Sequence, residues 1–213
     1  MKTVWIYGTA RNLSKTPAPP KDVEVWVANS PLAYFQRLPR MGDTHEWTRW
    51  FNLHSRAWME FKYPHGLHYY QEQDSSKPIY TQKYWSDIPG CVEFPRTAIQ
   101  EAFATTKGPI RYFTSSVNWM APFAFLEGFR RIEFWGFALS DTKPNGRWIP
   151  ERACWWYWVN RLRDLGCEIT YQPEIEAIPN IPGDPDEYSG KLYGYETKPE
   201  PDWDFERHCF QDE

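Results

Sequence analysis

Residues 114–136 read TSSVNWMAPFAFLEGFRRIEFWG, and they decide the fold class. The stretch begins with Thr114-Ser115-Ser116, residue types that favour the N-cap of a helix, and apolar residues then recur at helical spacing. Gly128 is typical of the position just after a helix, so we expect a helix over 116–128, kinked or strained by the internal Pro122. The run RIEFWG then predicts a β-strand at 131–136.

The same order of elements repeats downstream. A second helix is expected over about 150–165, with Glu151 in its first turn, followed by a strand over 167–171. Upstream, short apolar runs that end in small or polar residues predict strands at 4–7, 23–28, 48–51, 79–81 and 92–94. Because helices that alternate with strands are typical of a parallel sheet covered on both faces, we predict a Rossmann-like α/β fold with a mostly parallel sheet.

Residues 55–95 lack this regularity. They are rich in Tyr, His, Gln and Pro, and we expect mostly loops there apart from the two short strands. His65 and His68 have the i, i+3 spacing of a metal pair on a helix, but Pro64 and Gly66 argue against a helix. No metal site is therefore predicted.

The composition indicates one folded domain with a tail. A length of 213 residues suits a domain over 1–173, followed by a Pro-rich, acidic tail over 174–213 that packs back through the aromatic run 192–195. The net charge is only −4, and 13 Trp, 13 Tyr and 13 Phe supply abundant apolar surface, which argues against a disordered chain. We expect aromatic side chains to make up much of the core.

Charge, apolar runs and cysteine content indicate which functions and which cellular location are expected. The near balance of 24 basic and 28 acidic residues argues against a protein that mainly wraps nucleic acid. The sequence has no apolar run of membrane-spanning length, and the N-terminus lacks the apolar region of a signal peptide, so a cytoplasmic location is expected. The four cysteines have no zinc-binding spacing and are expected to be reduced and mostly buried.

Candidate binding residues follow the predicted strands, because ligands of open α/β sheets bind beyond the carboxyl ends of the strands. The turn Gly8-Thr9-Ala10-Arg11-Asn12 combines backbone N–H groups with a guanidinium, which suits a phosphate or nucleotide, although the segment also fits a plain turn that needs one glycine. Asn29 and Asn52 each end a predicted strand. Their amides suit the recognition of a base or a ribose, although Asn is also an ordinary residue at strand ends. We expect the two side chains to face one pocket.

Two further candidates lie nearby. Thr114, Ser115 and Ser116 are expected to cap the helix that follows, either alone or while also presenting hydroxyls and the helix N-terminus to an anion. His54 follows a strand end, where a general base would be useful, whereas it could also be a surface histidine. The Trp155-Trp156-Tyr157-Trp158 run is expected to pack a helix on the sheet, with base stacking as the minor interpretation.

The order of these motifs resembles that of the small bacterial sialyltransferases, and of uncharacterised tailed-phage proteins described as glycosyltransferase-like. In that family a first strand runs into a Gly-Asn-Gly-Pro-Ser-Leu turn, two later strands end in Cys-Asn and Tyr-Asn, and Thr-Ser-Gly opens a helix. The matching segments here are 7–13 (YGTARNL), 27–29 (VAN), 50–52 (WFN), 113–116 (FTSS) and 127–136 (EGFRRIEFWG). The match covers about residues 1–140 and fades beyond them.

The resemblance implies a nucleotide sugar as the donor substrate, with no metal or other cofactor. It implies that the donor contacts residues of the first four of these five segments. These residues are Gly8, Thr9 and Asn12 on the phosphate and ribose side, Asn29 and Asn52 on the nucleotide, and Thr114, Ser115 and Ser116 around the base. Arg11 or Arg147 would neutralise the leaving phosphate. Thr9, Ala10, Arg11 and Asn12 replace the family's Asn-Gly-Pro-Ser, and Ser116 replaces a glycine, so the donor nucleotide need not be CMP.

The catalytic base is the point where the resemblance is incomplete. The family's catalytic histidine falls after Gly136, where this chain has no histidine before His208. Either the base has moved, with His54, then Glu151, then Asp141 as candidates, or transfer has been lost.

Three functions therefore stay open. The first is a glycosyltransferase that acts on an acceptor hydroxyl, such as a saccharide or a modified base in phage DNA, in the host cytoplasm. The second is a protein that binds or sequesters a nucleotide or nucleotide sugar without turnover. The third is a structural protein that uses exposed Trp and Tyr as protein contacts.

Overall fold

A computed structural model describes residues 1–9, 17–29, 47–73, 77–137 and 148–171. The expected roles of Arg11, Asn12, Asp141 and Arg147, and the tail over 174–213, lie outside these residues. The strands are β1 (Thr3–Tyr7), β2 (Glu24–Ala28), β3 (Arg49–Asn52), β4 (Ile79–Thr81), β5 (Cys91–Glu93), β6 (Arg131–Trp135) and β7 (Glu168–Tyr171). The helices are α2 (Arg56–Lys62), α3 (Pro64–Gln71), α4 (Arg96–Ala102), α5 (Ser116–Leu126) and α6 (Trp148–Asp164).

The seven strands form one sheet in which every pair is parallel, in the order β5-β4-β3-β2-β1-β6-β7. This arrangement confirms the predicted Rossmann-like α/β fold. The chain runs from β1 outward to β5 on one side and then returns to add β6 and β7 on the other side of β1. The strand order therefore reverses at β1, which is the point where ligands of such sheets bind.

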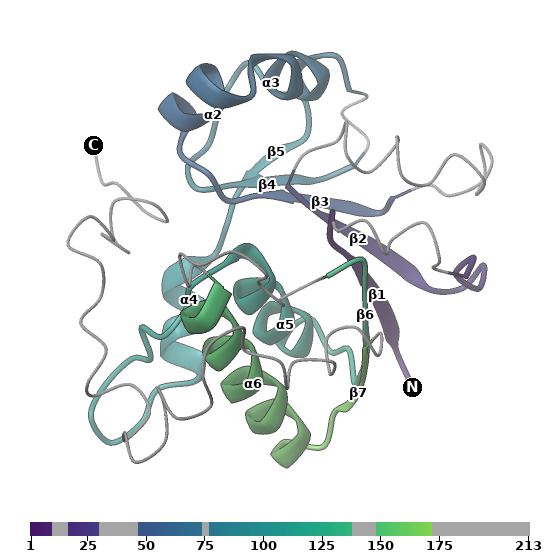
Figure 1. Ribbon diagram of the computed structural model, residues 1–213, viewed down its shortest axis with the longest axis vertical. Coiled ribbons are helices and arrows are strands. Elements are labelled where there is room, and N and C mark those ends of the chain that lie inside the picture. Colours follow the sequence, from purple (N-terminus) through teal and green to yellow (C-terminus); the bar gives the residue numbers. More distant parts are fainter. Residues whose placement is uncertain (10–16, 30–46, 74–76, 138–147, 172–213) are drawn as a thin grey trace, which may run out of the picture.

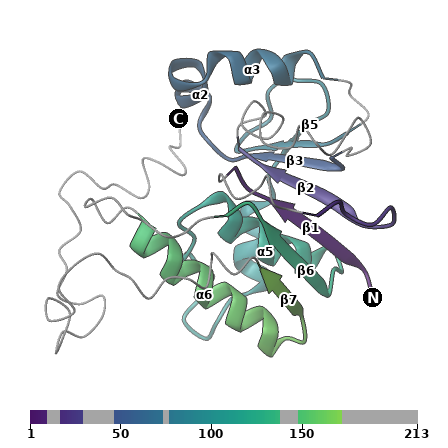
Figure 2. The same cartoon turned by 45° about the vertical axis from the view of Figure 1, so that its right-hand side comes forward.

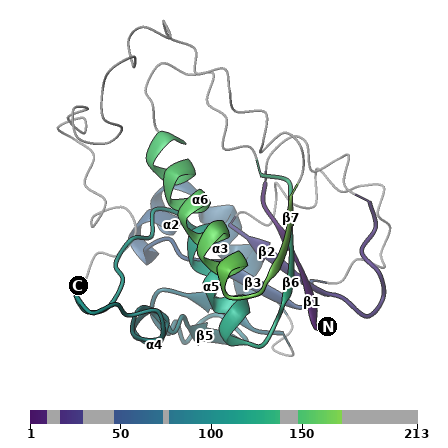
Figure 3. The same ribbon diagram turned by 90° about the horizontal axis from the view of Figure 1, so that it is seen from below.

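Helices cover both faces of the sheet. Figures 1 and 2 show α2 and α3 on one face, at the top of the view, and α4, α5 and α6 on the other. Seen from below, α5 and α6 lie side by side (Figure 3). Within the described residues, no helix combines the length and the apolar character that crossing a bilayer requires.

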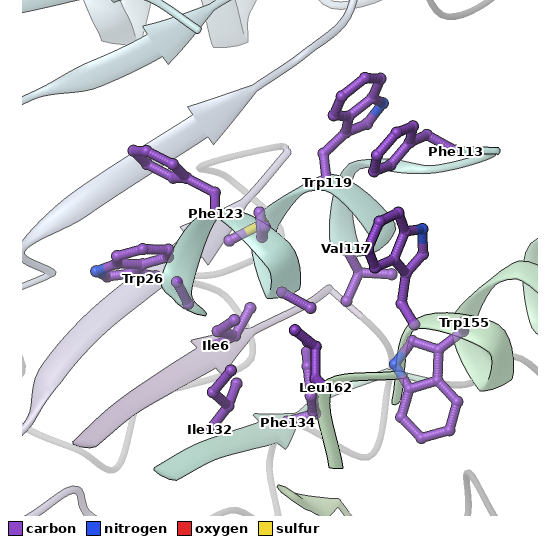
Figure 4. Close-up of a cluster of buried hydrophobic side chains, with 14 of the residues drawn as sticks. Ile6, Trp26, Phe113, Val117, Trp119, Phe123, Ile132, Phe134, Trp155 and Leu162 are labelled. Atoms are coloured by element: carbon purple, nitrogen blue, oxygen red, sulfur yellow. The ribbon is translucent and has the colours of Figure 1, made fainter. Parts of the chain in front are cut away.

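The core under α5 is aromatic, as predicted. Trp26 of β2 lies 5.0 Å from Phe51 and 5.5 Å from Phe123 between ring centroids, and Figure 4 shows Phe123 directed toward Trp26. Trp155 and Trp158 of α6 are buried in the same cluster, which confirms the packing role expected for them. A second cluster, beneath α2 and α3, includes Trp5, Trp50 and Tyr70.

The expectation of loops over 55–95 is wrong for most of its first part. Ser55 caps α2 by accepting a hydrogen bond from the Trp58 N–H at 3.2 Å. Pro64 then begins α3 instead of preventing it, because the first residue of a helix needs no N–H donor. A proline at that position is a helix start signal.

Helix α5 passes through Pro122 without interruption, from Ser116 to Leu126. Proline has no N–H, so the carbonyl of Asn118, four residues earlier, receives no helical hydrogen bond from it. The burial of Pro122 and its neighbours against the sheet offsets that loss. Cys154 and Cys167 are buried, Cys91 is half-buried, and no disulfide joins them.

Candidate functional site

The candidate site lies at the carboxyl ends of β1, β2 and β6, where the strand order reverses and where α5 begins. Gly8, Asn29 and Ser116 come to this edge from three different parts of the chain. Parallel strands present their carboxyl ends at one edge of the sheet, so the topology alone brings these residues together.

Gly8, just after β1, lies against the residues at the end of β6. Its N–H donates a hydrogen bond to the Trp135 carbonyl at 2.8 Å. A Cβ atom on Gly8 would lie 2.5 Å from the carbonyl oxygen of Gly136 and 2.7 Å from the ring of Phe137. No side chain fits there, so the contact between the two strand ends requires a glycine. The next residue, Thr9, is half-buried.

Asn29 is held in an unusual backbone conformation. Its φ of 63° is in the left-handed region, which Asn tolerates better than most residues. Its N–H donates to the Phe51 carbonyl at 2.8 Å, and its own carbonyl accepts from Trp50 Nε1 at 2.8 Å and from the Tyr70 hydroxyl at 2.5 Å. The surrounding structure thus fixes the direction of the Asn29 side chain.

The side chain of Asn29 reaches the N-terminus of α5. The Ser116 hydroxyl donates to Asn29 Oδ1 at 3.0 Å. Ser115 occupies the N-cap position, but its side chain makes no capping hydrogen bond, so the expected capping by a hydroxyl is wrong here. The Ser115 hydroxyl is buried and has no hydrogen-bond partner among the described residues. Helix α5 therefore begins at a serine whose hydroxyl makes no hydrogen bond to the helix.

Asn52 does not join this group, and the expectation that Asn29 and Asn52 face one pocket is wrong. The Asn52 side chain is 1% exposed and lies on the other face of the sheet, where Nδ2 donates to Met59 Sδ at 3.0 Å. Its Oδ1 accepts from the His54 N–H at 3.3 Å. Successive side chains of a strand alternate between faces, which puts Asn52 with Trp50 in the cluster under α2 and α3.

The two base candidates that the structure describes lie on opposite faces. The His54 ring stacks on Trp58 of α2, with 3.7 Å between centroids and 23° between planes. Glu151 is 7% exposed in the first turn of α6, on the face that carries α5. Glu151 is the candidate near the start of α5, because its backbone carbonyl accepts a hydrogen bond from Asn118 Nδ2 at 3.3 Å.

Asn118 and Tyr70 are residues of this region that the sequence analysis missed. Asn118 is fully buried in α5, and burial raises the pKa of Tyr70 well above its ordinary value. The one available signal was an Asn within the apolar run 117–126, where polar side chains are rare.

Metal-binding side chains do not gather in the described residues, where no group of three His, Cys, Asp or Glu is close enough to hold an ion. His65 and His68 do share a helix, contrary to expectation, but His68 pairs with Glu72 at 3.1 Å.

No protein-family model and no curated protein matches the sequence. Among solved structures, the chain is similar to the sialyltransferase CstII from Campylobacter jejuni, in complexes with CMP-3FNeuAc (TM-score 0.45, 13% identity), with cytidine-5′-monophosphate (0.43, 13%) and with a trisaccharide acceptor and CMP (0.42, 15%). Each alignment covers 80% of this chain, and 80%, 79% and 80% of the respective CstII chains.

Proposed function

We propose that the protein binds a nucleotide sugar at the carboxyl ends of β1 and β2, against the N-terminus of α5, and transfers the sugar to an acceptor hydroxyl. One observation carries this proposal: Ser115 stands at the N-cap of α5 with a hydroxyl that caps nothing, beside the Ser116–Asn29 hydrogen bond. Helix N-termini attract phosphate through their N–H groups and positive dipole end.

Each part of such a ligand has a matching group. The N–H groups of the first turn of α5 and the Ser115 hydroxyl suit a phosphate. Asn29 Oδ1 is engaged by Ser116, and the two N–H groups on Nδ2 suit a ribose hydroxyl or a base carbonyl. Thr9, two residues after the end of β1, supplies the adjacent hydroxyl, and Arg11, Asn12 and Arg147 keep their proposed roles on the phosphate side.

For the base we place Glu151 before His54. A general base has to lie within hydrogen-bond reach of the acceptor hydroxyl, and Glu151 shares the face and the neighbourhood of α5. His54 is engaged with Trp58 on the α2 side, and Asp141 stays a candidate. The acceptor we propose only as a hydroxyl, of a saccharide or of a modified DNA base, and we propose that no metal takes part.

Binding without turnover is the second candidate function. It is favoured by the burial of Glu151 at 7% exposure and by the stacking of His54, since neither side chain stands open to an acceptor. The two functions share one site and differ only in whether the donor is consumed.

The test is a thermal unfolding series with CMP-, UDP-, GDP- and dTDP-sugars, followed by donor hydrolysis measurements. A ligand that binds only the native state raises the unfolding midpoint, so we expect a rise with at least one donor and none with the free sugars. Hydrolysis of that donor supports transfer, whereas a rise without hydrolysis leaves the binding function. If no donor raises the midpoint, the proposal is wrong and the third function, protein contacts, gains weight.

A further inference from the structure

Asn118 is a polar residue in the most apolar part of the molecule. It is 0% exposed in the first turn of α5, and its Nδ2 donates to Thr114 Oγ1 at 2.9 Å and to the Glu151 carbonyl at 3.3 Å. These bonds connect three segments: the residues that lead into α5, α5 itself, and the first turn of α6.

The amide orientation of Asn118 follows from its partners. The Glu151 carbonyl oxygen can only accept, so the atom that faces it has to be Nδ2 and not Oδ1. Oδ1 therefore points the other way, where it is buried and has no hydrogen-bond partner among the described residues. A buried acceptor in this state destabilises the fold, and an apolar side chain of similar size would avoid that effect.

Two further hydrogen bonds hold α6 to the segment before α5: Cys154 Sγ and Trp158 Nε1 donate to the Tyr112 carbonyl at 3.3 Å and 2.9 Å. Both start farther along α6 than the Glu151 carbonyl that Asn118 contacts. Other contacts join α5 and α6 directly. They include apolar side chains such as Val117 and Trp155, which Figure 4 shows in one cluster. Apolar packing is non-directional, whereas a hydrogen bond requires one relative position. Pro122 also deprives the Asn118 carbonyl of its helical partner, so the first turn of α5 depends more on side-chain bonds.

We propose that Asn118 is a positioning residue that holds the first turn of α6, with Glu151, against the start of α5 beside the candidate site. This inference rests on the proposed function for its link to ligand binding. Asn118 itself touches no ligand in this proposal. It acts through Thr114 and Glu151, whose placement decides where the groups around Ser115 lie.

The experiment compares Asn118→Leu, which keeps the size and removes both polar atoms, with Asn160→Leu, the same exchange at an exposed position of α6. For Asn118→Leu we expect an unfolding midpoint close to that of the wild type, because the removal of the unpaired Oδ1 offsets the loss of the two bonds from Nδ2. We expect the affinity for the donor identified above to fall by about tenfold or more, because small displacements of binding groups are costly. Asn160→Leu should leave the affinity unchanged.

Hydrogen exchange supplies a readout that needs no ligand. In Asn118→Leu we expect faster exchange of the amides in the first turn of α6, around residues 151–155, with unchanged exchange in β1 and β6. If the leucine variant fails to fold, Asn118→Thr takes its place: it replaces the amide with a smaller hydroxyl, and we expect faster exchange around residues 151–155 there as well.

The outcomes separate the two proposals. Unchanged affinity or unchanged exchange at α6 in a folded Asn118→Leu protein overturns the positioning role. If the wild type binds none of the nucleotide sugars, the proposed function fails, and the exchange result alone decides whether Asn118 positions α6.

Discussion

The hydroxyl of Ser116 donates a hydrogen bond to Oδ1 of Asn29 across 3.0 Å, and this bond joins the start of α5 to the carboxyl end of β2. The two residues are far apart in the sequence, and each depends on its own local geometry. Asn29 presents its amide because its backbone is left-handed, and Ser116 presents its hydroxyl because Ser115 takes the N-cap position. The bond therefore marks the centre of the candidate site.

Asn29→Gly tests the amide without straining the backbone. Glycine accepts a φ of 63°, so we expect stability close to that of the wild type, with donor affinity lower by about 1–3 kcal/mol, the range for losing a buried polar partner. Calorimetric titration measures the affinity, and chemical denaturation measures the stability. Asn29→Ala serves as the comparison, since it adds the backbone strain that glycine avoids. Full affinity in the glycine variant would contradict a binding role for Asn29.

Ser115→Ala and Ser55→Ala form a matched pair. Ser55 caps α2, so its replacement should lower the free energy of unfolding by about 1 kcal/mol. Ser115 makes no capping bond, so its replacement should change stability little while lowering donor affinity. Equal losses of stability in both variants, with full affinity in Ser115→Ala, would show that Ser115 serves its helix alone.

Asp87 makes a contribution to the free energy of unfolding that depends on pH in the acidic range. Arg56 Nη1 and Nη2 donate to its two carboxylate oxygens at 2.8 Å each, and this pairing lowers the pKa of Asp87 to about 2. A folded-state pKa below the unfolded value stabilises the protein above about pH 4, and the contribution disappears as the pH falls toward 2. Because both side chains are partly exposed, we expect less than about 1 kcal/mol.

The measurement is the unfolding free energy of wild type and Asp87→Asn between pH 7 and pH 2. The difference should be constant down to about pH 4 and then shrink steadily as the pH falls toward 2. Glu101→Gln, on the exposed surface of α4, should show no such pattern. A difference that persists at pH 2 would mean that the stabilisation by Asp87 does not depend on its charge.

Glu133 should behave in the opposite way. It lies beside Trp5 in the register of β1 and β6, and burial raises the pKa of its carboxyl group. A raised folded-state pKa means that the folded protein holds the proton more tightly, so stability falls as the pH rises through this range. We expect Glu133→Gln to raise the unfolding midpoint at pH 7, with a smaller gain at pH 4. A variant less stable than the wild type at pH 7 would contradict this assignment.

The sequence by itself determined the strands, two of the helices and the mostly parallel character of the sheet, whereas the order of the strands came from the structure. The spacing of apolar residues and the residues that begin or end an element are local properties of the sequence. Strand β1 follows from an apolar run that ends at Gly8, and helix α5 follows from an apolar run that begins after Thr114. The same reasoning did not predict α2 and α3, because a proline within a segment argues against a helix. Pro64 occupies the first position of α3, where proline favours a helix.

The candidate site was determined by the sequence only in part. Gly8 and Asn29 were found because residues that follow parallel strands meet at one edge of the sheet, and Ser115 and Ser116 were found as part of an N-cap cluster. Which face each side chain takes was decided by the tertiary structure: Asn52 turns to Met59, Asn29 turns to Ser116, and Asn118 lies between two helices. These directions depend on partners distant in the chain, and no local pattern of residues encodes them.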